Sequence, residues 1–162
     1  MGSGLRFRTV LWPTDFSPLA QAALPYAVGL AAEHGGELVI LHVLPSLASY
    51  AGAEMPALAW KQLQDQNAAA EAALRRREAE QAAPHLRITT DLVEGVPVEE
   101  ILHAARRHRC ELIVIATHGR TGLAHVLMGS VAENVVRRAP CPVLTVRPSE
   151  LTHPQRGEGE TR

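Results

Sequence analysis

The sequence predicts a single α/β domain, a doubly wound parallel sheet of five strands with helices on both faces. Short apolar runs bounded by turn residues, typical of buried strands, alternate along the chain with segments of helical character. Right-handed βαβ crossovers produce this alternation and place helices on both faces of a sheet. The length of 162 residues corresponds to about one domain.

Nine elements are expected, each from a local signal. In order they are strand 7–14, helix 18–34, strand 38–43, helix 57–83, strand 88–94, helix 97–108, strand 112–117, helix 130–138 and strand 143–146. The first helix has Ser17 as a good N-cap and Pro18 at its first position, and Gly35 ends it. Residues 44–56 have no clear period and are interpreted as a loop.

The second half of the chain carries equally local signals. The segment 57–83 is rich in Ala, Gln, Glu and Arg and predicts a long surface helix that ends at Pro84. Polar residues within 88–94 predict an edge strand. The domain is expected over residues 5–148, and the polar segment 149–162 is expected to be a disordered tail.

Composition narrows the class of function. A formal net charge of −1 argues against a nucleic-acid-binding protein, and the Arg75–Arg77 run is interpreted as a solvated helix face. No apolar run is long enough to span a membrane, and no signal peptide is recognised. Cys110 and Cys141 lie far apart in the sequence, which favours free thiols in a cytoplasmic protein.

Several catalytic and ligand-binding motifs are absent from the sequence. It contains no Walker-type phosphate loop, no dinucleotide-binding G-x-G-x-x-G after the first strand, no nucleophile elbow and no H-E-x-x-H. His103 and His108 are five residues apart on one predicted helix, the wrong spacing for a shared metal ion. No metal site is therefore expected from the side chains.

The stretch that begins at Ala116 is the most informative about function. It follows the apolar run Leu112–Ile115 and contains Gly119, then nine residues, then Gly129 and Ser130 at the start of a predicted helix. Free backbone N–H groups and the positive end of the helix dipole suit such a helix start to phosphate.

Asp15 would lie across a crevice from this loop. Ligands of doubly wound sheets bind beyond the carboxyl ends of the strands, where the strand order reverses. If the first and fourth strands are neighbours there, Pro13, Thr14 and Asp15 face the glycine loop. Asp15 could then accept hydrogen bonds from sugar hydroxyls, although it could also be an ordinary loop acid.

Two further residues of the loop region have two interpretations each. Ser130 and Glu133 fit a capping box, S-x-x-E, which is compatible with phosphate at the same helix start. His118 could donate a hydrogen bond to a phosphate or only fill the loop.

Three segments together resemble the universal stress protein family. They are VLWPTDFSPLAQAAL near the start, LVILHVLP at the second strand, and ATHGRTGLAHVLMGSVAENVVRRAPCPVLTVRP near the end. The resemblance covers nearly the whole chain up to Pro148, and it implies the strand order 3-2-1-4-5. That order puts the reversal between the first and fourth strands.

The resemblance also implies a nucleotide site. The nucleotide-binding branch of the family carries G-x-x-G, nine residues, then G-[S/T], and here Ala116 replaces the first glycine. By resemblance, Asp15 holds the ribose of ATP, AMP or ADP, and the backbone of Val43 contacts the adenine edge. The phosphates, with Mg²⁺ or Mn²⁺ held by them, would be bound by these residues: Ala116, Thr117, His118, Gly119, Arg120, Gly129, Ser130 and Val131.

The expected function is a cytoplasmic stress-response protein that acts as an adenine-nucleotide-dependent switch with at most slow ATP hydrolysis. The alternative is a family member that has lost nucleotide binding and acts as a protein-interaction module. A homodimer is expected through the last strand, Val143–Val146, an edge that exposes unpaired backbone groups. The resemblance implies the same dimer.

Overall fold

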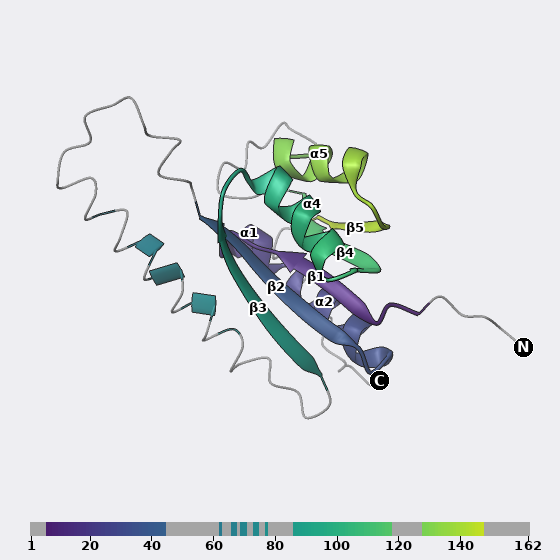
Figure 1. The fold of residues 1–162 in the computed structure, drawn as a ribbon. Coiled ribbons are helices and arrows are strands. Elements are labelled where there is room, and N and C mark those ends of the chain that lie inside the picture. The colour runs from purple at the N-terminus through teal and green to yellow at the C-terminus, as the bar shows by residue number, and fades with distance from the viewer. Residues whose placement is uncertain are drawn as a thin grey trace, which may run out of the picture.

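The chain forms one sheet of five parallel strands in the order β3-β2-β1-β4-β5 (Figure 1). The computed structural model describes residues 6–44, 62, 66, 67, 69, 70, 73, 74, 77, 86–117 and 128–147. The strands are β1 (Thr9–Pro13), β2 (Glu37–Leu44), β3 (Arg87–Glu94), β4 (Leu112–Ala116) and β5 (Val143–Val146). The predicted fold class and strand order are therefore confirmed.

The position of β1 at the middle of the sheet follows from its composition. Val10, Leu11 and Trp12 are completely buried, as a strand with neighbours on both edges and helices on both faces requires. Thr9 is in register with Glu37 of β2, and Val10 with Leu112 of β4. The strand order reverses between β1 and β4, as predicted.

Helices cover both faces of the sheet, and two apolar cores result. Helices α1 (Pro18–Gln21) and α2 (Leu24–Glu33) lie on one face, and α4 (Pro97–Arg107) and α5 (Ser130–Arg138) on the other (Figure 1). Alternate residues of β1 serve the two cores: Val10 and Trp12 pack with α2, and Leu11 packs with α4 and α5.

The first helix differs from the prediction of a continuous helix over 18–34. The chain forms α1 and α2 with a break between Gln21 and Leu24. Pro25 explains the break, because proline has no N–H and its ring clashes with the carbonyl four residues earlier, here that of Gln21. The predicted N-cap is confirmed, since the Ser17 side chain accepts a hydrogen bond from the Ala20 N–H.

The segment 57–83 can be followed only where the structure describes it. All eight described residues between 62 and 77 are helical. Leu74 is 3% exposed and belongs to the core that α2 also lines, and Arg77 is half-buried. The described part of this segment therefore packs into the protein at Leu74. The remaining residues of the predicted loop after Leu44 and the predicted tail 149–162 lie outside the described residues.

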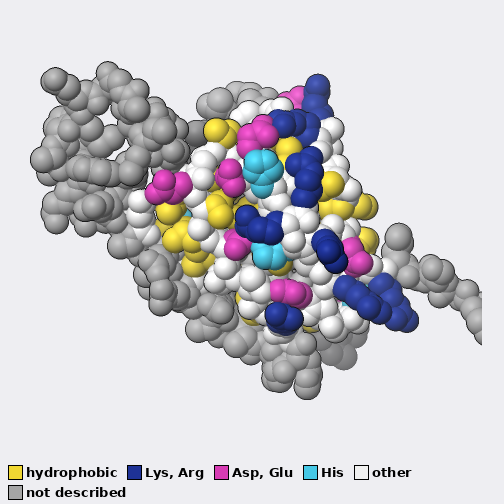
Figure 2. All heavy atoms as spheres, in the orientation of Figure 1, with side chains coloured by type: hydrophobic (Ala, Val, Ile, Leu, Met, Phe, Trp, Pro, Cys, Tyr) yellow, Lys and Arg dark blue, Asp and Glu magenta, His cyan; other side chains and the backbone are white. Residues whose placement is uncertain are grey.

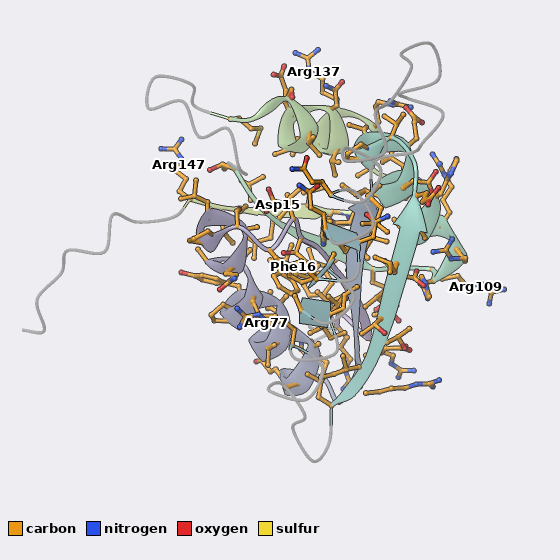
Figure 3. All side chains as sticks on the ribbon, turned by 90° about the vertical axis from the view of Figure 1, so that its left-hand side faces the viewer. Asp15, Phe16, Arg77, Arg109, Arg137 and Arg147 are labelled. Atoms are coloured by element: carbon orange, nitrogen blue, oxygen red, sulfur yellow. The ribbon has the colours of Figure 1, made fainter. Side chains whose placement is uncertain are left out.

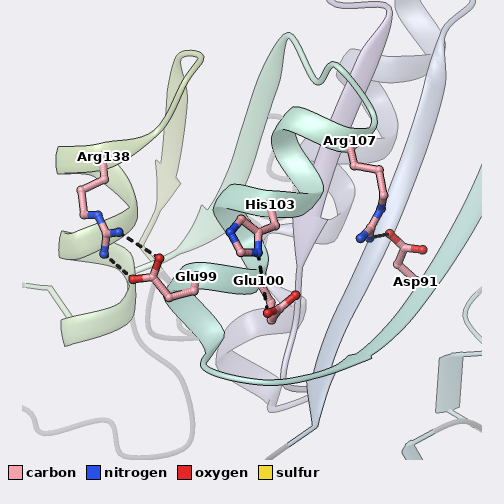
Figure 4. Close-up of polar contacts among 6 residues, drawn as sticks. All are labelled: Asp91, Glu99, Glu100, His103, Arg107 and Arg138. Carbon is pink, nitrogen blue, oxygen red and sulfur yellow. Dashed lines mark hydrogen bonds and ion pairs between the residues drawn. The ribbon is translucent and has the colours of Figure 1, made fainter.

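Ion pairs hold α4 at both ends (Figure 4). Glu99 in its first turn accepts two hydrogen bonds from Arg138 of α5, at 2.7 and 2.9 Å. At the other end, Asp91 of the edge strand β3 accepts from Arg107 at 2.5 Å and from His108 at 2.7 Å. Figure 2 shows that arginines and carboxylates interleave on this face of the molecule.

Burial of Asp91 favours its uncharged form, but the hydrogen bonds and the charge of Arg107 and His108 outweigh it. The pKa of Asp91 is therefore lowered from its ordinary value of 3.8. The carboxylate that ties β3 to α4 is stabilised in its charged form.

Candidate functional site

A cavity of about 290 Å³ opens at the carboxyl ends of β1 and β4, next to the first turns of α4 and α5. This is the switch point, where ligands of doubly wound sheets bind. Of the twelve residues predicted for a site, nine line the cavity: Pro13, Thr14, Asp15, Val43, Ala116, Thr117, Gly129, Ser130 and Val131. The other three, His118, Gly119 and Arg120, lie outside the described residues.

The loop after β1 is held in place by its own side chains and by β2. The Thr14 N–H donates to the Leu41 carbonyl at 2.9 Å, which extends the β1–β2 ladder to the edge of the cavity. Asp15 Oδ1 accepts from the Ser17 N–H at 2.9 Å, closing a short turn that leads into α1. Asp15 and Phe16 come from this loop, between α5 and helices α1 and α2 in Figure 3.

On the other side of the cavity, the end of β4 is tied to the start of α5. The Gly129 N–H donates to the Thr117 carbonyl at 2.6 Å, and the Thr117 N–H donates to Val146 of β5 at 2.9 Å. Thr117 is 2% exposed. The backbone at 117 therefore links β5, β4 and the helix start, and this fixes Gly129 at the rim of the cavity.

The start of α5 corrects the predicted capping box. Gly129, in extended conformation with φ −69° and ψ 153°, is the N-cap, and no side chain caps the helix. Ser130 is instead the first helical residue. Glu133 pairs with Arg137 at 2.9 Å rather than with the cap. The capping-box spacing failed because the helix, tied from Gly129 to Thr117, starts one residue earlier than a box with Ser130 as N-cap requires.

The helix start consequently offers donors to the cavity. Within the described residues, the N–H groups of Ser130, Val131 and Ala132 have no hydrogen-bond acceptor. All three residues line the cavity. Unpaired N–H groups and the positive end of a helix dipole attract an anion.

Sequence reasoning missed several of the apolar residues that line the cavity. Pro97 and Ile101 from the first turns of α4 line it, together with Leu41 and Ile115 from the sheet. The signal was available for α4, because helices of a parallel sheet begin at the same edge as the strands end. Pro97 therefore lies at the same edge of the sheet as the start of α5.

No group of three or more His, Cys, Asp or Glu side chains that could hold a metal ion occurs in the described parts of the chain. Asp15 is the one ionisable side chain among the described cavity residues. Among the described residues, a cation in this cavity would find the Asp15 carboxylate as its one ionisable ligand.

Comparison with known proteins places the chain in a family. The model of the universal stress protein family matches residues 6–147, which include every described element. The chain belongs to the universal stress protein family. This confirms the resemblance found in the sequence, and members of this family are stress-response proteins.

Individual universal stress proteins are similar over nearly the whole length. The universal stress protein MJ0531 of Methanocaldococcus jannaschii is 32% identical over 87% of this chain and 82% of its own. The structure of universal stress protein UspA from Lactobacillus plantarum is 30% identical, covers 88% of this chain and 99% of its own, and has a TM-score of 0.77.

A universal stress protein solved in complex with cAMP is 27% identical and covers 90% of this chain and 100% of its own, with a TM-score of 0.65. An adenine nucleotide is thus a ligand of a structural neighbour of this universal stress protein.

None of the helices in the described ranges has the length and apolar character needed to cross a lipid bilayer.

Proposed function

We propose that this protein binds an adenine nucleotide, ATP or a related AMP or ADP, in the cavity at the switch point. The observation that carries the proposal is the pairing of Asp15 on one wall with the N–H groups at the start of α5 on another. A carboxylate suits sugar hydroxyls and a helix start suits phosphate.

The apolar part of the cavity supplies what a base requires. Leu41 and Val43 from β2 and Ile101 from α4 offer a surface for a flat ring. Pockets for small molecules are mostly apolar and carry a few well-placed polar groups. The volume of this cavity, about 290 Å³, lies near the lower end of the usual range for such pockets. The base would lie against α4, the sugar at Asp15 and the phosphates at α5.

Ala116 is the residue that favours the alternative, a protein-interaction module without nucleotide. Its backbone nevertheless shows no positive φ, so the described conformation does not require glycine. Its side chain is 7% exposed and belongs to the core on the α2 face. We infer that the methyl group is accommodated by packing.

A switch suits the site better than a turnover enzyme. Fast phosphoryl transfer needs a group that positions the attacking water and groups that stabilise charge at the γ-phosphate. The described cavity residues offer Asp15 alone as an ionisable side chain. We propose at most slow hydrolysis, with Mg²⁺ or Mn²⁺ held by the phosphates and water.

We further propose a cytoplasmic location and a homodimer through β5. Both cysteines are free thiols, Cys110 buried and Cys141 half-buried, as reducing conditions favour. The strand β5 is an edge of the sheet, and Leu144 within it is exposed.

Mass spectrometry of the natively purified protein and calorimetry with ATP–Mg²⁺ test the proposal together. We expect a co-purified adenine nucleotide or saturable binding at one site per chain, weakened by Asp15→Asn. The absence of both would remove the nucleotide proposal and leave the interaction module. Rapid multiple-turnover hydrolysis would contradict the switch.

A further inference from the structure

A buried histidine braces the loop that carries Asp15. His42 of β2 is 6% exposed, in a strand that is otherwise almost entirely apolar. Its Nδ1 lies 2.8 Å from the Thr14 carbonyl oxygen. A carbonyl only accepts, so Nδ1 carries a proton and donates it. A polar side chain buried in a core strand destabilises the protein unless it makes hydrogen bonds. The Nδ1 hydrogen bond of His42 is made to the residue before Asp15.

The same imidazole contacts the residue after Asp15. The Phe16 ring stacks on His42 with centroids 4.7 Å apart and planes at 27°. Phe16 has a φ of 60°, a left-handed conformation that is rare for an aromatic residue. Strain of this kind persists only where the surroundings hold it, and it concentrates at functional sites.

Further contacts hold Phe16 in that conformation. Its N–H donates to Thr14 Oγ1 at 3.0 Å, and its carbonyl accepts from Gln21 Nε2 at 3.0 Å. Asp15 thus lies between two residues that His42 contacts, one through a hydrogen bond and one through a ring face.

We propose that His42 and Phe16 are positioning residues that fix the Asp15 carboxylate at the cavity and so determine how strongly the sugar of the ligand is bound. This inference rests on the proposed function, because it assigns Asp15 to the sugar hydroxyls. The competing explanation is that His42 only packs the core.

Substitutions at His42 separate these explanations. His42→Leu removes the donor and keeps an apolar side chain of similar bulk, whereas His42→Asn keeps a donor near the place of Nδ1. The loss of one hydrogen bond should weaken ATP binding about three- to ten-fold in His42→Leu. Affinity should return toward that of the unmodified protein in His42→Asn.

The ligand comparison makes the test specific to the sugar. Calorimetry with ATP and with 2′,3′-dideoxy-ATP, which lacks both hydroxyls, should show a loss for ATP only. His42→Leu should also add nothing to Asp15→Asn, since both act through one carboxylate. An equal loss for the two ligands, or additive losses in the double variant, would overturn the positioning role.

A second measurement does not depend on nucleotide. Hydrogen exchange of the Phe16 and Ser17 amides, whose N–H groups bond within the turn, should be fastest in His42→Leu, which loses both contacts of the imidazole. It should rise less in Phe16→Leu and in His42→Asn, which each lose only the ring contact. Unchanged exchange in a folded His42→Leu protein would overturn the brace. If the unmodified protein binds neither nucleotide while exchange responds as expected, the proposed function fails and the brace on Asp15 stands.

Discussion

At the scale of single residues, a substitution at Gly129 gives the most direct test of the proposed nucleotide binding. Its φ of −69° and ψ of 153° are accessible to any residue, so Gly129→Val should fold. The branched side chain would occupy space at the rim of the cavity, beside the N–H groups proposed for phosphate. We expect affinity for ATP–Mg²⁺ to fall about ten-fold or more, by a loss of roughly 1.4 kcal/mol or more, measured by calorimetry.

His118→Ala provides the comparison for Gly129→Val, although residue 118 lies outside the described structure. It removes at most one donor and should cost less affinity than the valine substitution. Nucleotide binding that is unchanged in folded Gly129→Val would mean that the phosphates lie elsewhere.

The two cysteines should differ in reactivity. Burial, with a smaller contribution from the neighbouring Cys141 charge, raises the pKa of the Cys110 thiol to about 12. At pH 8 only about one Cys110 in 10,000 would be a thiolate, the reactive form. We expect iodoacetamide to label Cys110 slowly in the folded Cys141→Ser variant and rapidly in urea.

The Cys110→Ser variant is the matched control for this labelling. Burial also raises the pKa of Cys141, but its side chain is only half-buried, so native labelling should be faster there. Equal native rates in the two variants would contradict the burial argument.

Among the secondary-structure elements, the turn between α2 and β2 depends on Gly36. A Cβ added there would lie 2.3 Å from the Arg8 carbonyl oxygen, which accepts from the Glu37 N–H at 2.6 Å. Gly36→Ala must therefore push β1 and β2 apart where their ladder begins. We expect a loss of roughly 2 kcal/mol in the free energy of unfolding, measured in urea.

Gly29 within α2 is the matched control, because a Cβ added there meets nothing within 4 Å. Gly29→Ala should stabilise the protein by about 0.5–1 kcal/mol, since alanine loses less entropy in a helix. Destabilisation of equal size by both alanines would show that close approach at Gly36 is not the cause.

The tie between β3 and α4 should make stability depend on pH. The folded-state pKa of Asp91 is lowered, so its contribution is present above the unfolded value near 3.8 and is lost as pH falls through the folded value. We expect Asp91→Asn to cost about 1 kcal/mol at pH 7, in line with partly exposed ion pairs.

Urea unfolding of both proteins from pH 7 down to pH 3 measures this dependence. The difference between the unmodified protein and Asp91→Asn should narrow below pH 4. A difference that stays constant across that range would show that the charge of Asp91 is not what stabilises the contact.

For the whole molecule, the orientation of β5 decides how the proposed dimer can be tested. The carbonyls of Pro142 and Val146 accept hydrogen bonds from the N–H groups of Ile113 and Thr117, on the side of β4. The backbone N–H and C=O groups of successive residues point to opposite sides of a strand. Those of Val143 and Thr145 therefore point to the open edge of the sheet. Thr145→Pro removes an outward donor and leaves the β4–β5 ladder intact. We expect a dimer at micromolar concentration in sedimentation, and monomers for Thr145→Pro.

A proline at Leu144 would be a poorer test, because that residue faces β4 and its change would damage the sheet itself. Thr145→Val is the control, since it keeps the donor and the strand preference and should remain dimeric. A monomeric unmodified protein would exclude the dimer, and a dimeric, folded Thr145→Pro protein would exclude this interface.

Much of the fold was predictable because its signals are local. The apolar runs at Val10–Trp12 and Leu112–Ile115 reveal buried strands without knowledge of their neighbours. Ser17 marks a helix start by its own chemistry. The break before Leu24 was not predicted, although Pro25 carries its signal, because helical spacing continues on both sides of the break.

The candidate site was predictable where it belongs to strand ends and unpredictable where it depends on packing. Pro13–Asp15 and Ala116–Thr117 follow strands that meet at the reversal, so topology brings them together. Pro97 and Ile101 join them only because α4 is packed on the same face as α5. The capping box at Ser130 was wrong because a tertiary hydrogen bond from Gly129 to Thr117 set the helix start.

By itself, the sequence determined the alternation of strands and helices and the family, and it predicted the crevice that is proposed for a ligand. The alternation follows from periodicity and the family from the resemblance of three segments, and both are properties of the chain alone. Only the tertiary structure decided which atoms face that crevice and what holds them. The contact of His42 with the residue before Asp15, and the position at which α5 starts beside the cavity, depend on hydrogen bonds between residues 28 and 12 positions apart. No local pattern encodes such contacts, because they form only when separate elements pack.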